Sequence, residues 1–145
     1  MYEKALVAVD GSKPSLKAVE TARELARKGL LRNITLAYVI HIPHPIDSVD
    51  GMVLDFIPPG YQKELLGEAR KVMGQARDLF PPDCTVEAVI ESGPPAETIL
   101  HMIDKERFDL VIVGHRGLNQ LQRLFLGSVS NKIVNLASCT VIVVK

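Results

Sequence analysis

Near its C-terminal end the chain reads Asp109-Leu-Val-Ile-Val-Gly-His-Arg-Gly-Leu-Asn-Gln-Leu-Gln-Arg-Leu-Phe-Leu-Gly-Ser-Val-Ser130. The apolar run over 110–113 predicts a buried strand that ends in Gly114 and Gly117. Gly127 and Ser128 then open a segment with helical periodicity. Glycine lets backbone N–H groups approach a ligand closely, and a helix start offers unpaired N–H donors at the positive end of its dipole. The stretch therefore predicts an anion cradle between a strand and a helix.

The composition predicts one globular domain without a strong overall field. The chain has 145 residues, of which 17 are basic and 17 acidic, so its formal net charge is zero. This balance argues against broad attraction to nucleic acid or an anionic membrane, and any anion site must be local. The two cysteines, Cys84 and Cys139, form no metal-binding spacing, and neither a leader nor an apolar run of membrane length is seen. We therefore expect a cytoplasmic protein.

Working outward from the cradle, strand and helix patterns alternate along the whole chain. Ser12 or Ser15 is expected to cap the first helix, and Gly29 to stop it. Gly67 and Gly74 interrupt the second helical pattern at a cost of roughly 1 kcal/mol each, which would be tolerable if a neighbour packs closely there. A proline-rich excursion over 41–60 has no regular pattern. The predicted strands cover 5–9, 33–40, 84–90, 110–113 and 140–144, and the later helices cover 61–80, 96–105 and a segment from Gly127 or Ser128.

This alternation predicts an α/β fold, a Rossmann-like three-layer sandwich with helices on both faces of a five-stranded parallel sheet. Ligands of such sheets bind beyond the carboxyl ends of the strands, where the strand order reverses. Polar or glycine features follow the first strand, at Asp10, and the fourth, at Gly114. If those strands are neighbours, the order is 3-2-1-4-5 and Asp10 faces the cradle across a crevice. Neither GxxxxGK[ST] nor GxGxxG after the first strand occurs, so the cradle must be built mainly from backbone.

Three parts of the sequence resemble the universal stress protein family. They are the spacing Gly-x2-Gly-x9-Gly-Ser from Gly114 to Ser128, the opening Ala5-Leu-Val-Ala-Val-Asp-Gly-Ser12, and Leu126-Gly-Ser-Val-Ser-Asn-Lys-Ile-Val134 with the apolar strand after it. The resemblance covers essentially the whole chain. It implies an ATP-binding domain that forms a homodimer. One departure is the run Ser138-Cys-Thr-Val141, which lacks the proline that often introduces the last strand.

The resemblance also implies which residues contact the nucleotide. Asp10 would contact the ribose or the adjacent base edge, and Val39 would pack on adenine. The two loop glycines, Gly114 and Gly117, would let the chain pass the ribose and phosphates. Phosphates would be bound by N–H and hydroxyl groups of Gly127, Ser128, Val129 and Ser130. The predicted set is completed by Ala8, Val9 and Arg116.

Plainer roles stay open for several of these residues. Asp10 could be a turn aspartate satisfied by its own backbone, and Ser128 and Ser130 could cap a helix. Arg116 could reach phosphates or be a solvated surface arginine. Val39 rests wholly on the resemblance, because an apolar residue at a strand end is normally part of the core.

The sequence thus predicts a nucleotide-responsive binder that takes ATP, AMP or ADP, with Mg²⁺ or Mn²⁺ accompanying the phosphates. It would dimerise through the terminal strand Val141-Ile-Val-Val144 and act on an unknown protein partner. We hypothesise that ATP orders residues 118–126 and the excursion over 41–60. No nucleophile with a flanking base is evident. Two alternatives remain: an enzyme that hydrolyses ATP or transfers an adenylyl or phosphoryl group, and a nucleotide-free interaction module.

Overall fold

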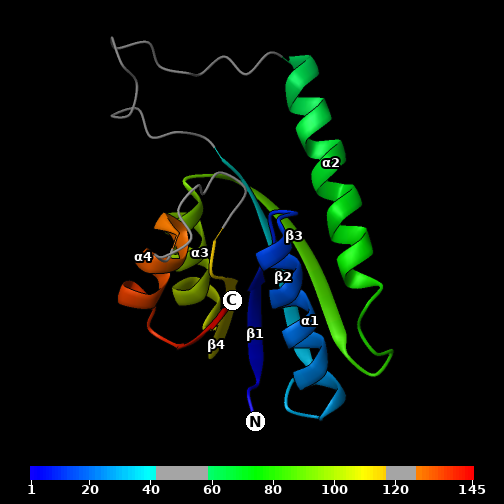
Figure 1. Ribbon diagram of the computed structural model, residues 1–145, viewed down its shortest axis with the longest axis vertical. Coiled ribbons are helices and arrows are strands. Elements are labelled where there is room, and N and C mark those ends of the chain that lie inside the picture. Colours follow the sequence, from blue (N-terminus) through cyan, green and yellow to red (C-terminus); the bar gives the residue numbers. More distant parts are fainter. Residues whose placement is uncertain (42–58, 117–126) are drawn as a thin grey trace.

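The computed structural model describes residues 1–41, 59–116 and 127–145 and shows a three-layer α/β sandwich (Figure 1). All pairings in its sheet are parallel, and the strand order is β3-β2-β1-β4-β5. This confirms the predicted fold class and strand order. The strands are β1 (Lys4–Ala8), β2 (Asn33–His41), β3 (Thr85–Gly93), β4 (Leu110–Gly114) and β5 (Thr140–Val144). The helices are α1 (Lys13–Arg27), α2 (Pro59–Arg77), α3 (Pro95–Glu106) and α4 (Ser128–Leu136).

The central strands β1 and β4 are covered on both faces by helices, and successive side chains of a strand point to opposite faces. In β1, Ala5 and Val7 join the core under α1 and α2, whereas Leu6 joins the core under α3 and α4. Figure 1 shows the two helix pairs on opposite sides of the sheet. Because both faces of this central strand are buried, its sequence is a continuous apolar run rather than an alternation of apolar and polar residues.

The adjacency of β1 and β4 places the two polar strand exits side by side. Ala5 is in register with Leu110, and Val7 with Ile112. Both strands run in the same direction, so the turn at Asp10 and the glycine at the end of β4 reach the same edge of the sheet. The first and fourth strands are therefore neighbours, which was the condition for Asp10 to face the cradle.

The second helix ends earlier than predicted, and its two glycines have no close neighbour among the described residues. It stops at Arg77 rather than at Phe80, because the last turn tightens: Leu79 N–H donates to Ala76 O over 3.3 Å, and Phe80 N–H donates to Arg77 O over 3.2 Å. No described atom lies within 4 Å of a Cβ built on Gly67 or Gly74. The described residues therefore provide no close neighbour that would offset the cost of these two glycines.

Candidate functional site

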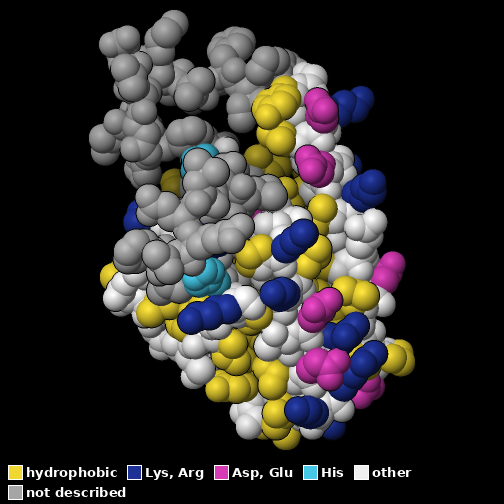
Figure 2. All heavy atoms as spheres, viewed as in Figure 1, with side chains coloured by type: hydrophobic (Ala, Val, Ile, Leu, Met, Phe, Trp, Pro, Cys, Tyr) yellow, Lys and Arg dark blue, Asp and Glu magenta, His cyan; other side chains and the backbone are white. Residues whose placement is uncertain are grey.

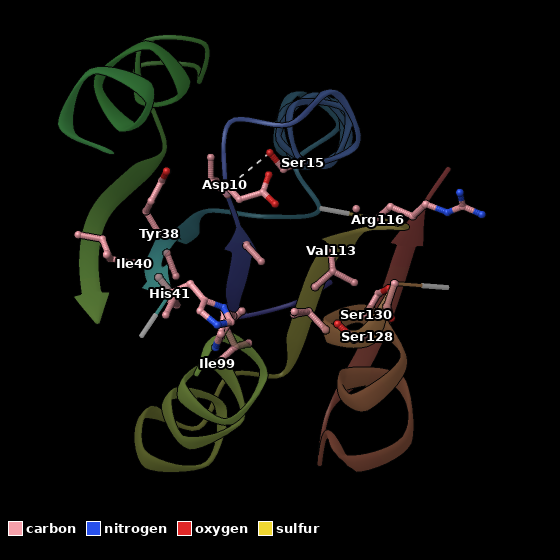
Figure 3. Close-up of a pocket in the computed structure, with 18 of the residues that line it drawn as sticks. Asp10, Ser15, Tyr38, Ile40, His41, Ile99, Val113, Arg116, Ser128 and Ser130 are labelled. Carbon is pink, nitrogen blue, oxygen red and sulfur yellow. Dashed lines mark hydrogen bonds between the residues drawn. The ribbon is translucent and has the colours of Figure 1, made fainter. Parts of the chain in front are cut away.

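A crevice of about 590 Å³ lies beyond the carboxyl ends of β1, β2 and β4 (Figure 3). Its volume falls in the usual range of small-molecule sites, roughly 300–1,000 Å³. Most of the predicted ligand residues line it, and they come from four separate elements. They are Ala8, Val9, Asp10, Val39, Gly114, Arg116, Gly127, Ser128, Val129 and Ser130. Gly117 and the segments over 42–58 and 118–126 lie outside the described residues.

At the start of α4, which lines this crevice, the first backbone donors have no acceptor among residues 1–41, 59–116 and 127–145. Gly127 is the N-cap residue, with φ −61° and ψ 159°, and it makes no side-chain cap. The first intrahelical bond runs from Asn131 N–H to Gly127 O over 2.9 Å. The N–H groups of Ser128, Val129 and Ser130 precede that bond, and none of them has an acceptor within the described part of the chain. Such a helix start favours an anion.

The hydroxyl of Ser130 holds this helix start in place. It donates to His115 O over 2.8 Å and lies 3.1 Å from Gly127 O, and the residue is only 3% exposed. Gly127 N–H donates to the same His115 carbonyl over 2.9 Å. Ser130 therefore fixes Gly127 beside the end of β4, and its proton is engaged within the protein. What the helix start offers a ligand is mainly backbone N–H, together with the exposed Ser128 hydroxyl.

Across the crevice, Asp10 sits in a turn that its own side chain stabilises. Its Oδ1 accepts from Ser12 N–H over 2.8 Å, and its backbone N–H donates to Ser15 Oγ over 3.2 Å. Gly11 has φ +82°, which favours glycine. Asp10 is therefore a turn aspartate whose Oδ1 accepts from a nearby backbone N–H, as its plainer role predicted. Asp10 also lines the crevice, and Figure 3 shows its carboxylate directed toward the side of β4.

The close approach at Gly114 is to the protein's own backbone. A Cβ built there would lie 2.6 Å from Pro14 C, 2.8 Å from Pro14 O and 2.8 Å from Ser15 N. These atoms belong to the first turn of α1, which packs directly against the end of β4. A hundred residues of sequence separate the two segments, so the sequence motif alone could not reveal this contact.

The other end of the crevice is apolar and aromatic, and Val39 is the residue of that end that the sequence predicted. Residues on both faces of β2 reach it, and so does the start of α2. The missed residues are Ser15, Ala37, Tyr38, Ile40, His41, Tyr61, Leu65, Pro95, Ile99 and Val113. The i, i+4 pair Tyr61 and Leu65 was the one available signal, because it marks one face of a helix. Such a surface suits a planar, partly apolar group.

Two titratable groups near the crevice have shifted pKa values. Burial, then the carboxylates of Glu68 and Asp10, raise the pKa of Tyr38, so its hydroxyl stays a proton donor at neutral pH. Burial, then the charges of Arg116 and Lys145, lower the pKa of His115. The Arg116 side chain itself extends away from the other labelled residues, beyond Ser128 and Ser130 (Figure 3).

The face of the molecule shown in Figure 2 has no large patch of a single charge sign among the described residues. Basic and acidic side chains are interspersed over α1 and α2 (Figure 2). Across residues 1–41, 59–116 and 127–145, no three His, Cys, Asp or Glu side chains are grouped as metal ligands. In the same ranges, no helix has both the length and the apolar character needed to cross a membrane. Any attraction of the crevice for an anion would therefore have to come from the oriented backbone at the start of α4.

Comparison with known proteins gives matches along the full chain. A sequence model of the universal stress protein family matches residues 1–145. A universal stress protein of Thermus aquaticus, encoded in the QAH/OAS sulfhydrylase 3′ region, is 33% identical over 150 residues and is covered completely, as is this chain. The UspA structure from Lactobacillus plantarum is 25% identical, with a TM-score of 0.76, and the match covers 99% of this chain and 98% of that one.

Two further solved structures of the same fold are described with a bound adenine nucleotide. A universal stress protein in complex with cAMP is 24% identical, with a TM-score of 0.70, and the match covers 99% of this chain and 97% of that one. An Arabidopsis thaliana family protein with AMP bound is 22% identical, with a TM-score of 0.63, and the match covers 99% and 91%. At these identities the likeness is one of fold.

Proposed function

The chain belongs to the universal stress protein family, and from this premise we propose that its crevice binds an adenine nucleotide, with ATP as the preferred ligand. The observation that carries the proposal is the open start of α4, which faces Asp10 across the paired strands β1 and β4. One side offers N–H donors that no described residue accepts from, and the other offers a carboxylate. A nucleotide matches both, because its phosphates accept hydrogen bonds and its ribose and base donate them.

An adenine base suits the apolar end of the crevice. Val39, Tyr38 and Ile99 line that end, and the proposed base would lie among them, between β2 and α3. Two proteins of the same fold are described with cAMP and AMP, which supports an adenine nucleotide as the class of ligand. Guanine or pyrimidine nucleotides are the natural competitors for a selectivity test.

A triphosphate uses the start of α4 more fully than a monophosphate. The helix dipole contributes about 0.3–1 kcal/mol to an exposed anion, and about 2 kcal/mol when the site is partly buried. This is far below the roughly 8 kcal/mol of a micromolar ligand, so several N–H bonds and burial of the base must supply the rest. The N–H groups of Ser128, Val129 and Ser130 would hold the phosphates. Gly127, whose own N–H donates to His115 O, would let the chain pass close to them, and a divalent cation would travel with them.

We further propose that the protein is a cytoplasmic homodimer formed at the edge strand β5. Its apolar residues Val141 to Val144 are all half-buried, and β5 is paired on one side only. Next to it, Leu136 of α4 is 67% exposed and Val134 is 43% exposed. An apolar, half-covered sheet edge favours pairing with a second copy. Mass measurement in solution tests this, and a monomer at micromolar concentration would contradict it.

In this role the protein responds to nucleotide and is read by a protein partner in the stress response. The hypothesis that ATP orders residues 118–126 and the excursion over 41–60 concerns segments outside the described residues. Hydrogen exchange of those segments with and without ATP tests the hypothesis directly. Identical exchange in both states would remove it.

The nucleotide itself can be identified without prior choice of ligand. The protein is purified gently and denatured, and any released small molecule is identified by mass spectrometry. We expect ATP or one of its products in near-stoichiometric amount. A ligand present at a hundred times its Kd should also stabilise the folded state by about 2.7 kcal/mol. Absence of both a released nucleotide and a thermal shift with added ATP would overturn the proposal in favour of a nucleotide-free module.

A further inference from the structure

We propose that Gly114 and Ser15 are positioning residues for Asp10, which sets recognition of the nucleoside part of the ligand. Gly114 acts through the protein rather than through direct contact with the ligand. This inference rests on the proposed nucleotide binding and names the residues that hold one side of the site in place. Three contacts carry it, and together they lead from the exit of β4 to the exit of β1.

The first contact is between Gly114 and the first turn of α1. The missing side chain leaves room for the backbone of Pro14 and Ser15, whose atoms would lie 2.6–2.8 Å from a Cβ. Because these are backbone atoms of a helix, they cannot rotate away as the end of a side chain could. Any larger residue at this position must push the first turn of α1 away from β4.

The second contact joins that turn to Asp10. Ser15 is buried, and its Oγ accepts from Asp10 N–H over 3.2 Å and donates to Ser12 O over 3.0 Å (Figure 3). The third contact returns to the carboxylate, because Asp10 Oδ1 accepts from Ser12 N–H over 2.8 Å. Both the backbone and the side chain of Asp10 are therefore set by the position of α1, which Gly114 permits.

The consequence is that the two halves of the site are held by different hydrogen bonds. Asp10 is held by α1, which Gly114 admits, whereas the start of α4 is held by hydrogen bonds from Ser130 and Gly127 to the carbonyl of His115. A change at Gly114 should disturb the same recognition that Asp10 provides.

A double-mutant cycle on ATP affinity tests this coupling. We expect Gly114→Ala, Ser15→Ala and Asp10→Asn each to weaken ATP binding about tenfold. The double variant Gly114→Ala with Asp10→Asn should lose little more than either single variant. Multiplicative losses with Asp10→Asn, or an unchanged affinity in Asp10→Asn alone, would overturn the proposal. If Gly114→Ala fails to fold, Ser15→Ala enters the same cycle.

A readout without ligand separates this proposal from nucleotide binding itself. In the free protein we expect the Asp10 amide to exchange at least about tenfold faster in Gly114→Ala and in Ser15→Ala, relative to the Ile112 amide of the core strand β4. Equal acceleration of both amides would show only global destabilisation and would contradict the positioning role. Gly67→Ala serves as the control glycine change, because its Cβ meets no described atom. If ATP does not bind at all but this selective acceleration is seen, the proposed function fails while the positioning stands.

Discussion

Helices α1 and α4 begin after neighbouring strands at the same edge of the sheet, yet their starts are built in opposite ways. Ser12 caps α1, because its Oγ accepts from Ser15 N–H over 3.3 Å, and the Asp10 carboxylate takes Ser12 N–H. Gly127 begins α4 without any side-chain cap. The first start is capped by the protein itself, whereas the N–H donors of the second have no acceptor in the part of the chain that the structure describes.

The difference indicates which start is structural and which can hold a ligand. A sealed start adds stability to the fold, since each cap residue typically contributes about 0.5–2 kcal/mol. An open start gives up that stability and retains an anion site. The two sides of the crevice therefore respond differently to mutation: the α1 side in the free energy of unfolding, and the α4 side in the affinity for a phosphate group.

The largest expected effect is at the contact that locks α1 against β4. Gly114→Ala places a Cβ against the Pro14 backbone and should lower the free energy of unfolding by about 1–3 kcal/mol or more. Urea denaturation measures this, with Gly67→Ala as the matched control. A Gly114→Ala protein as stable as the wild type would mean that α1 does not pack against β4 as described.

The second-largest expected effect comes from a substitution that would cap the start of α4. Gly127→Asp puts a carboxylate at the N-cap of α4, where it can accept from the free N–H groups and repel a phosphate, so ATP affinity should fall about tenfold or more. The backbone at Gly127 is extended and suits other residues, although a Cβ would lie 3.3 Å from Arg116 Cα. Gly127→Asn is the control, because it caps the helix without the charge.

In calorimetric titrations we expect the order wild type, Gly127→Asn, Gly127→Asp, from tightest to weakest. Equal affinities of the wild type and the aspartate variant would remove the start of α4 from the binding site.

A pair of serine variants compares the two starts directly. Ser12→Ala removes the cap of α1 and should lower the free energy of unfolding by about 1 kcal/mol. Ser128→Ala removes an exposed hydroxyl that makes no cap and should change stability by less than about 0.5 kcal/mol. Thermal and urea unfolding of both variants measure the difference. Equal stability losses would show that the two starts are alike after all.

The smallest effect is at the glycines of α2. Gly67→Ala and Gly74→Ala fill no occupied space and improve helix propensity, so each should raise the free energy of unfolding by up to about 1 kcal/mol. This is the opposite sign to Gly114→Ala, and it separates glycines that permit a contact from glycines that only weaken a helix. A loss of stability in either variant would indicate a neighbour that packs against α2.

Much of the fold was predictable because it depends on local patterns and on one topological rule. The apolar runs marked the strands, and the polar exits at Asp10 and Gly114 led to the observed order. The opposed positions of Asp10 and the helix start followed from that order. Contacts between distant segments were not predictable. The packing of Gly114 on Pro14 and the support that Ser15 gives Asp10 depend on how α1 is seated, and the apolar wall from Tyr61 and Leu65 depends on the placement of α2.

The central claim is that the open start of α4 holds the phosphates of an adenine nucleotide, and amide hydrogen exchange by NMR tests it most directly. Exchange is followed for Ser128 and Val129 in the free protein, with saturating ATP, and with adenosine, which lacks phosphates. We predict that ATP slows both amides by at least about tenfold and that adenosine leaves them nearly unchanged. Equal exchange in the free and ATP-saturated protein would contradict the claim.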